Sequence, residues 1–341
     1  MPQLSFFTRL LDDAPAAQRY ALAAEQIRQA ERVGLDRAWV AQHHFRAAEG
    51  GLPAPFVFLA HVAAVTDRIR LGTGVVTLTL EDPVRVAEDA VVLDALSGGR
   101  VDLGLGSGGT PSSFAPFGLE LDDKTEVYER KLAVLSAALA GSDVGAGNTV
   151  YPDPGGLGRR VWQATFSVAG GARAGRAGHG LLLSRTQPRP EGRASASLAD
   201  LQQPIIDAYL AALPSDASPR VTASRTVFVA DDADEARRFA DVGLRRSAVA
   251  FRGGAASDAS LDELIGASDT HVGTPEQVAA SLAADPTLGR ADEIAFQVHS
   301  VDAPHEHVLR SIELFATQVA PSLGWAPHTA GFAGSTSGVH A

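Results

Sequence analysis

The chain has 341 residues, of which 29 are basic and 40 acidic, so its formal net charge is −11. This acidic balance argues against nucleic acid or an anionic membrane as a partner, because both need a basic face. The absence of cysteine excludes disulfides, thiolate metal sites and a cysteine nucleophile. The sequence has no run of roughly 18 apolar residues that would span a membrane. Residues 1–7 carry no basic region ahead of an apolar stretch, so we expect a cytoplasmic protein.

Short apolar runs alternate with longer amphipathic segments, a pattern typical of parallel strands joined by helices. Eight such units indicate an α/β fold, a closed (β/α)8 TIM barrel with loop insertions, although an open doubly wound sheet would show the same alternation. Helices are predicted at residues 15–33, 54–65, 82–98 and 125–139. Strands are predicted at residues 4–10, 36–41, 69–80, 101–106, 161–167, 180–184, 225–230 and 293–299.

Three segments interrupt this alternation, at residues 141–160, 186–197 and 251–273. Each is rich in Gly, Pro, Ser or Asp, so we predict loops or small excursions from the barrel rather than linkers between domains. We expect residues 1–326 to form a single barrel domain. Residues 327–341, rich in Gly, Ala, Ser and Thr, are predicted to be a disordered C-terminal tail.

Two adjacent histidines, His43 and His44, directly follow the second predicted strand. Neighbouring strand residues point to opposite faces, so only one of the pair can face the barrel mouth. Catalytic groups of this fold lie at the C-terminal strand ends, where a histidine can act as an acid or a base near neutral pH. A loop histidine bonded to a backbone carbonyl remains the alternative. Adjacent histidines on a strand cannot both bind one metal ion, so we predict no metal site.

Residues 104–109 (GLGSGG) match the GxGxxG pattern of a dinucleotide-binding turn. The following residues, 110–118, contain two prolines and no helical period, and the motif follows the fourth strand rather than the first. We therefore interpret the motif as a Gly-rich strand end at which the backbone passes close to a flat ligand. A tight turn that needs positive φ is the alternative.

A candidate phosphate-binding turn lies between the strand at 161–167 and a short Ala/Gly-rich helical segment. Ser167, Gly170 and Gly171 open this helix, where exposed N–H groups and the helix dipole attract an anion. A close-packed turn would have the same composition. Arg185 and His299 end two later strands and are also positioned to reach the barrel mouth.

Four segments together resemble the bacterial luciferase-like monooxygenases in residues, order and spacing. The resemblance extends from about residue 4 to residue 325. The segments are 39–45 (WVAQHHF), 71–75 (LGTGV), 93–100 (LDALSGGR) and 103–108 (LGLGSG).

The resemblance implies a barrel, usually dimeric, that binds reduced FMN across its strand ends. It implies that the reduced flavin reacts with O2 to form a C4a-peroxide that oxidises a small organic substrate, and that a separate flavin reductase supplies the reduced FMN. His43 matches the first histidine of the luciferase pair, which is catalytic there. Light emission does not follow, because many chemistries share this fold and cofactor.

The resemblance also implies where the cofactor binds. Luciferase itself has an arginine where this chain has Ser107, so contacts at that position are expected to differ. Its reactive cysteine has no counterpart here. With Arg185 added from its strand-end position, the predicted cofactor-binding residues are Thr73, Gly74, Val75, Gly106, Ser107, Gly108, Ser167, Gly170, Gly171 and Arg185.

Three alternative functions remain open from the residues. Related enzymes on the same barrel use the deazaflavin F420 for hydride transfer without oxygen. A non-catalytic flavin-binding protein would share the cofactor site, and a nicotinamide dehydrogenase would rest only on the GxGxxG match. The loops expected to select the organic substrate are 47–55, 110–123 and 186–197, and they carry no chemical signature that identifies it.

Overall fold

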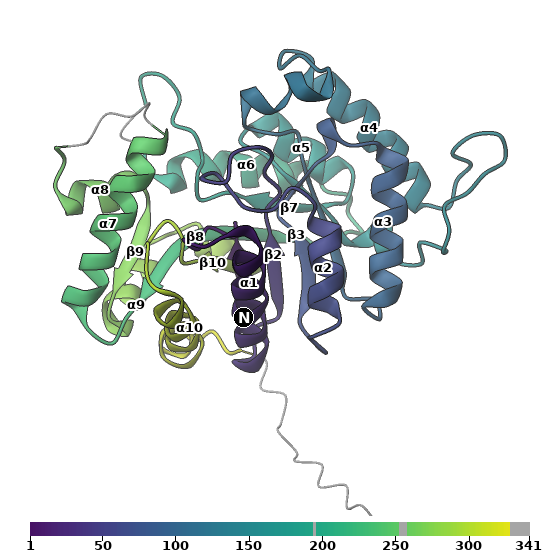
Figure 1. Ribbon diagram of the computed structural model, residues 1–341. Helices are drawn as coiled ribbons and strands as arrows, with labels where there is room; N and C mark the ends of the chain where they lie inside the picture. The colour runs from purple at the N-terminus through teal and green to yellow at the C-terminus, as the bar shows by residue number, and fades with distance from the viewer. Residues whose placement is uncertain (194–195, 252–257, 328–341) are drawn as a thin grey trace, which may run out of the picture.

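Eight parallel strands close into a barrel (Figure 1). The structure, a computed structural model, describes residues 1–193, 196–251 and 258–327. Each barrel strand pairs with the next along the chain, and the last pairs with the first, which closes the ring. The predicted (β/α)8 barrel is confirmed, and the open sheet is excluded. The barrel strands are β1 (Gln3–Thr8), β2 (Arg37–Val40), β3 (Arg70–Thr73), β5 (Val101–Gly106), β6 (Val161–Ala164), β7 (Gly180–Leu183), β8 (Val221–Val229) and β10 (Glu293–Gln297).

Helices alternate with the strands and surround the barrel (Figure 1). Apolar side chains between the strands and the helices form the main core, as expected for a parallel barrel covered on its outer face. No helix within the described residues is long and apolar enough to cross a membrane. The helices are α1 (Ala16–Arg32), α2 (Pro55–Ala63), α3 (Pro83–Leu96), α4 (Lys124–Leu139), α5 (Val168–Arg176), α6 (Leu198–Ala212), α7 (Ala233–Phe251), α8 (Leu261–Ala267), α9 (Pro275–Ala283), α10 (His305–Leu314) and α11 (Ala320–Ser322).

The segment 251–273, predicted to be a loop or a small excursion, has secondary structure of its own. It contains helix α8 and strand β9 (Thr270–Gly273), which pairs with the C-terminal end of β8. The sequence analysis missed the strand because four residues carry too short an apolar run to detect. Ser260 and Glu263 form a capping box at the start of α8, a signal that the sequence does contain. Residues 252–257 lie outside the described residues.

Two further strand boundaries differ from the prediction. The expected strand at 69–80 is β3, then a two-residue strand β4 (Val76–Thr77) paired with β5, and a 3₁₀ turn at Leu78–Leu80. All three pieces are largely buried, so residues 69–80 form one continuous apolar run. Such a run gives no sign in the sequence of where β3 ends and β4 begins. Strand β8 begins at Val221 rather than at residue 225. The predicted tail lies, from residue 328 onward, outside the described residues.

Two tryptophans fill the middle of the barrel. Trp39 and Trp162 meet edge to face, with ring centroids 5.7 Å apart and planes at 84°. Each ring lies over a glycine of the neighbouring strand, Gly72 and Gly180, where a Cβ would come within 2.2 and 2.1 Å of a ring carbon. The two rings can pack in this way because the glycines have no Cβ atom. The strand register places this tryptophan layer between the N-terminal and C-terminal ends of the barrel.

Candidate active site

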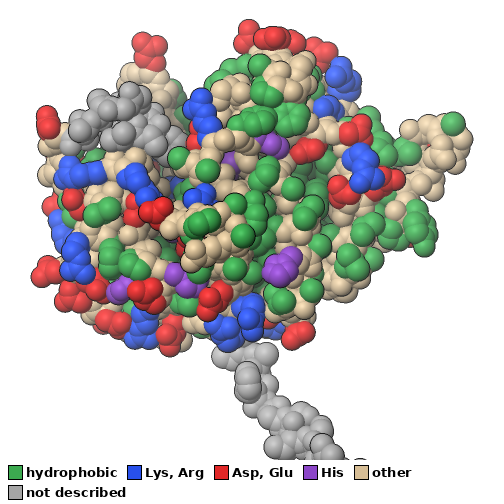
Figure 2. All heavy atoms as spheres, viewed as in Figure 1, with side chains coloured by type: hydrophobic (Ala, Val, Ile, Leu, Met, Phe, Trp, Pro, Cys, Tyr) green, Lys and Arg blue, Asp and Glu red, His purple; other side chains and the backbone are tan. Residues whose placement is uncertain are grey.

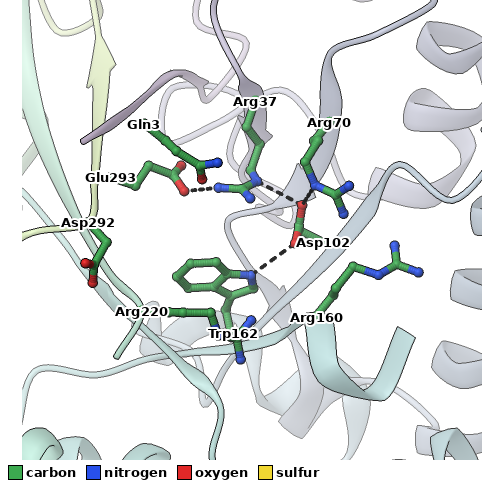
Figure 3. Close-up of a pocket in the computed structure, with 9 residues that line it drawn as sticks. All are labelled: Gln3, Arg37, Arg70, Asp102, Arg160, Trp162, Arg220, Asp292 and Glu293. Atoms are coloured by element: carbon green, nitrogen blue, oxygen red, sulfur yellow. Dashed lines mark hydrogen bonds and ion pairs between the residues drawn. The ribbon is translucent and has the colours of Figure 1, made fainter. Parts of the chain in front are cut away.

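A cavity of about 350 Å³ opens at the N-terminal end of the barrel (Figure 3). Arg37 lies in it between Glu293 and Asp102, and Asp102 also accepts a hydrogen bond from Arg70 at 2.6 Å. Burial alone would raise the pKa of Asp102, but Arg37 and Arg70 outweigh it and hold the pKa below its ordinary value. The two arginines and the two carboxylates neutralise one another within the chain. We therefore interpret this end as structural, the usual role of the N-terminal face of this fold.

His43 lies at the opposite, C-terminal end, directly after β2. Its ring packs against Gly50, where a Cβ would come within 2.3 Å of Nδ1. This Nδ1 is buried and has no hydrogen-bond partner among the described residues. Burial, followed by the nearby charges of Arg9, His44 and Arg185, lowers the pKa of His43 to about 4. The imidazole is therefore neutral at pH 7.

The residues on either side of His43 point elsewhere. The His44 ring packs edge-on against Phe117, with centroids 5.0 Å apart. The Gln42 side chain bonds Glu81 at 2.6 Å and the backbone N–H of Thr77 at 2.7 Å, both beyond the end of β3. Of the two histidines, only His43 has a pKa lowered by the charges of Arg9 and Arg185.

Arg9 and Arg185 follow β1 and β7 directly, and both are buried. Neither forms an ion pair within 4 Å with a carboxylate of the described residues. Arg9 donates to the Ser300 hydroxyl at 3.0 Å and to the Glu49 carbonyl at 3.4 Å, but its buried Nε has no partner. Burial lowers the pKa of Arg9 to about 10. Burial and then the charge of Arg9 lower the pKa of Arg185 well below its ordinary value.

His299, which the sequence analysis selected for its strand-end position, follows β10 at the C-terminal end of the barrel. Its Nε2 is 3.6 Å from the carboxylate of Asp12, and neither ring nitrogen has a hydrogen-bond partner in the described chain. Burial would raise the pKa of Asp12, but His299 and His305 outweigh it and lower the pKa. No three His, Asp or Glu side chains among the described residues are grouped so as to hold a metal ion.

The C-terminal ends of β3 and β5 form a wall of small residues. The Thr73 hydroxyl donates to the Gly104 carbonyl at 2.8 Å and accepts from the Gly104 N–H at 2.9 Å, so this side chain ties the two strands together. A Cβ on Gly74 would lie 2.8 Å from a phenylalanine ring of β1, and one on Gly106 would lie 2.6 Å from Val75. The peptide between Gly74 and Val75 is cis. The two glycines are therefore required for close packing of Phe7 and Val75 at these strand ends.

The GxGxxG motif continues this wall but does not open an α-helix. Ser107 follows β5, and its carbonyl accepts a hydrogen bond from the Thr79 hydroxyl at 3.0 Å. Gly108 has a φ of +86°, a conformation that glycine adopts without strain. A 3₁₀ turn at Pro111–Ser113 comes next. The dinucleotide-binding interpretation lacks its helix, and the positive φ of Gly108 is the feature that the tight-turn alternative requires.

Ser167 is the N-cap residue of α5, and its hydroxyl accepts the Gly170 N–H at 3.1 Å. A Cβ on Gly170 would come within 1.9 Å of the Thr165 hydroxyl oxygen, and one on Gly171 within 2.6 Å of the Ile205 carbonyl in α6. Both glycines are therefore required for close packing of the turn and of the two helices.

The start of α5 also fits an anion. The N–H groups of Val168 and Ala169 belong to the first turn of the helix and have no intrahelical acceptor. Gln187, from the loop after β7, donates to the Phe166 carbonyl at 2.8 Å, so this helix end and the Arg185 loop lie side by side. A phosphate here would accept N–H groups at the positive end of the helix dipole.

Arg9 was missed in the sequence analysis, although it carries the same signal as Arg185. Both residues come directly after a strand that ends at the barrel mouth. The predicted strand at 4–10 included Arg9, which concealed its position beyond the end of β1. Applying the strand-end rule after every predicted strand would have found it.

A family profile described as luciferase-like monooxygenase matches residues 3–291. The chain therefore belongs to this family, whose known members support an oxidoreductase. The y4vJ protein of Sinorhizobium fredii is 27% identical over 322 residues, covering 88% of this chain and 90% of its own. Limonene 1,2-monooxygenase of Rhodococcus erythropolis is 31% identical over 173 residues, 48% of this chain and 44% of its own. The F420-dependent glucose-6-phosphate dehydrogenase of Beutenbergia cavernae is 39% identical over 128 residues, 36% and 38% of the two chains.

Two solved structures illustrate the shared fold. The monooxygenase RslO1 from Streptomyces bottropensis superposes with a TM-score of 0.77 at 24% identity, covering 94% of this chain and 99% of its own. The oxygenating constituent of 3,6-diketocamphane monooxygenase from Pseudomonas putida, in complex with FMN, gives a TM-score of 0.72 at 18% identity, covering 94% and 98%. At these identities the likeness extends to the fold.

Proposed function

We propose that this protein is an FMN-dependent monooxygenase that uses reduced FMN and O2 to oxidise a small organic substrate. The observation that carries the proposal is the position of His43, a buried neutral imidazole with a free Nδ1 at the barrel mouth, next to the two unpaired arginines. A neutral imidazole has one N–H donor and one nitrogen acceptor, so His43 can hydrogen-bond the reacting groups at pH 7, while its lowered pKa makes it a weak base there.

The residues at the mouth fit FMN. The wall of Gly74, Val75 and Gly106 offers a surface for the ring system, and Ser167 with the first N–H groups of α5 offers an anion site for the phosphate. When bound, the reduced flavin supplies the two electrons needed to activate O2, and the protein supplies orientation and proton transfer. In this proposal the His43 imidazole holds a proton beside the ligands, and Thr73 keeps the wall rigid by joining β3 to β5.

We also propose that the protein works as a homodimer and receives reduced FMN from a separate flavin reductase. Support for the dimer comes from α2 and α3, which carry large apolar side chains on their outer faces. Val57 is 75% exposed, Leu96 69% and Val92 45%. Figure 2 shows hydrophobic side chains gathered on the side where α2 and α3 lie in Figure 1. Exposed apolar side chains on neighbouring helices are a feature of protein interfaces.

An F420-dependent hydride-transfer enzyme is the second candidate, favoured by the similarity to the F420-dependent dehydrogenase of Beutenbergia cavernae. The two cofactors can be separated by titrating the purified protein with reduced FMN, oxidised FMN and F420, and then exposing each reduced complex to air. We expect preferential binding of reduced FMN and O2 consumption by that complex. Binding of F420 alone, without O2 consumption, would overturn the FMN assignment.

A further inference from the structure

The buried arginines of this protein fall into two groups. Arg37 and Arg225 are buried and each contacts a carboxylate, Asp102 at 2.9 Å and Asp285 at 2.6 Å respectively. Arg9 and Arg185 are equally buried, yet neither has a carboxylate within ion-pair distance in the described chain. An unpaired buried charge is costly, and two like charges near one another add to that cost. A pair of arginines in this state is therefore suited to receive an anion.

The carboxylates nearest to this pair already have other partners. The Glu49 carboxylate accepts the Thr110 hydroxyl at 2.9 Å and contacts Arg46 at 3.3 Å. The Asp12 carboxylate accepts from Gln26 at 2.8 Å and faces two histidines. The charge of Glu49 acts on Arg9 and opposes the lowering of its pKa, but neither acid forms an ion pair with Arg9 or Arg185 in the described chain. One nearby carboxylate leaves the two arginines with a net positive charge.

Unsatisfied polar atoms surround the same place. Arg9 Nε, His43 Nδ1 and His299 Nδ1 are buried without a hydrogen-bond partner among the residues described, whereas His299 Nε2 faces the Asp12 carboxylate at 3.6 Å. Buried polar atoms in folded proteins normally have partners, and exceptions gather where a ligand binds. These orphan atoms come from the ends of β1, β2 and β10, so they converge on the mouth from three strands.

We propose that Arg9 and Arg185 form a subsite that binds the carboxylate of an acidic organic substrate and holds that substrate beside His43. This rests on the proposed monooxygenase function, which it extends by naming the substrate class. A guanidinium presents its N–H donors as a planar fork that matches the two oxygens of a carboxylate. The FMN phosphate has its own site at the start of α5, so the arginine pair remains available for a second anion.

The test measures binding of three simple carboxylates, acetate, benzoate and octanoate, to the full chain by calorimetry, with octanamide as the uncharged match of octanoate. We expect at least one carboxylate to bind and octanamide to bind at least about tenfold more weakly. Arg9→Gln and Arg185→Gln should each weaken carboxylate binding about tenfold or more. Arg46→Gln, which removes an exposed positive charge from the His43 loop, should leave it within about twofold.

Reduced FMN binding is measured on the same variants to separate this proposal from the monooxygenase function. We expect Arg9→Gln and Arg185→Gln to weaken carboxylate binding more than FMN binding, and the comparison is made for both variants because Arg185 is also a predicted cofactor-binding residue. Failure of all three carboxylates to bind would overturn the substrate class and leave the FMN assignment standing. Loss of FMN affinity in both variants, with carboxylate binding intact, would instead assign the arginines to the cofactor and also overturn the proposal. Absence of FMN binding in the unmodified chain would overturn the monooxygenase function alone.

Discussion

The two ends of the barrel differ in whether their buried arginines are paired with carboxylates. At the N-terminal end, Arg37 lies between Asp102 and Glu293, and the network is complete within the chain (Figure 3). At the C-terminal end, Arg9 and Arg185 are buried to a similar degree and have no carboxylate partner in the described residues. The tryptophan layer of Trp39 and Trp162 separates the ends by register.

From this difference we infer that the N-terminal end stabilises the fold and that the C-terminal end binds ligands. A buried charge that is paired within the chain needs no ligand. A buried charge without a partner lowers the free energy of unfolding, and a bound ligand of opposite charge raises it again. Sites that bind or catalyse often carry such strain, because the ligand rather than the chain completes them. Variants at matched positions on the two ends should therefore respond differently.

The largest expected difference concerns stability. Replacing Asp102 by Asn removes the carboxylate that Arg37 and Arg70 share and leaves Arg37 with Glu293 alone, so we expect the free energy of unfolding to fall by about 3 kcal/mol. Replacing Arg185 by Gln removes a buried charge that lacks a partner, so the free energy of unfolding should stay constant or rise. Urea denaturation of both variants measures this. An equal fall in the free energy of unfolding in both variants would mean that the two ends of the barrel do not differ in how their buried charges affect stability.

The second expected difference concerns activity. Replacing His43 by Asn should lower turnover-linked oxidation of reduced FMN about a hundredfold, the usual effect of removing a general acid or base. The free energy of unfolding should change little, because Nδ1 makes no hydrogen bond within the described chain. His44→Asn is the matched control, since this ring packs against Phe117 instead. Unchanged turnover in the His43 variant would remove this residue from the mechanism.

A smaller effect is expected at the start of α5. Replacing Ser167 by Ala removes the N-cap and should cost about 1 kcal/mol of stability. It should also weaken FMN more than riboflavin, which has no phosphate. Ser260→Ala removes the N-cap of α8 and should show only the loss of stability. Equal weakening of FMN and riboflavin by the Ser167 variant would argue against the phosphate site.

The sequence predicted most of the fold because every barrel strand is a short apolar run followed by a helical period. It failed at Thr270–Gly273, where four residues are too few to establish a pattern, and at Gly74, where a break interrupts a continuous apolar run. Within the candidate site, strand-end position found His43 and Arg185. The absence of carboxylates near Arg185 was not predictable, because it depends on where Glu49 and Asp12 point after folding.

The smallest expected effect is a change in the pKa of one histidine. Burial and then the charges of Arg9, His44 and Arg185 lower the pKa of His43 to about 4. His179, at the N-terminal end before β7, also has a pKa of about 4, because of burial and the charge of Arg220. Arg185→Gln should therefore raise the pKa of His43 and leave that of His179 unchanged.

The sign of the linked effect on stability follows from these values. Unfolded histidine has a pKa of about 6.5, so between pH 6.5 and 4 the unfolded chain binds more protons at His43 than the folded chain does. Stability is therefore lost as the pH falls through this window, and Arg185→Gln should reduce the loss. Titration of the two histidine rings by NMR, with unfolding measured at pH 7 and pH 5, tests both statements. A parallel shift of His43 and His179 would mean that the charge of Arg185 acts across the whole barrel, and the two ends would then not be electrostatically separate.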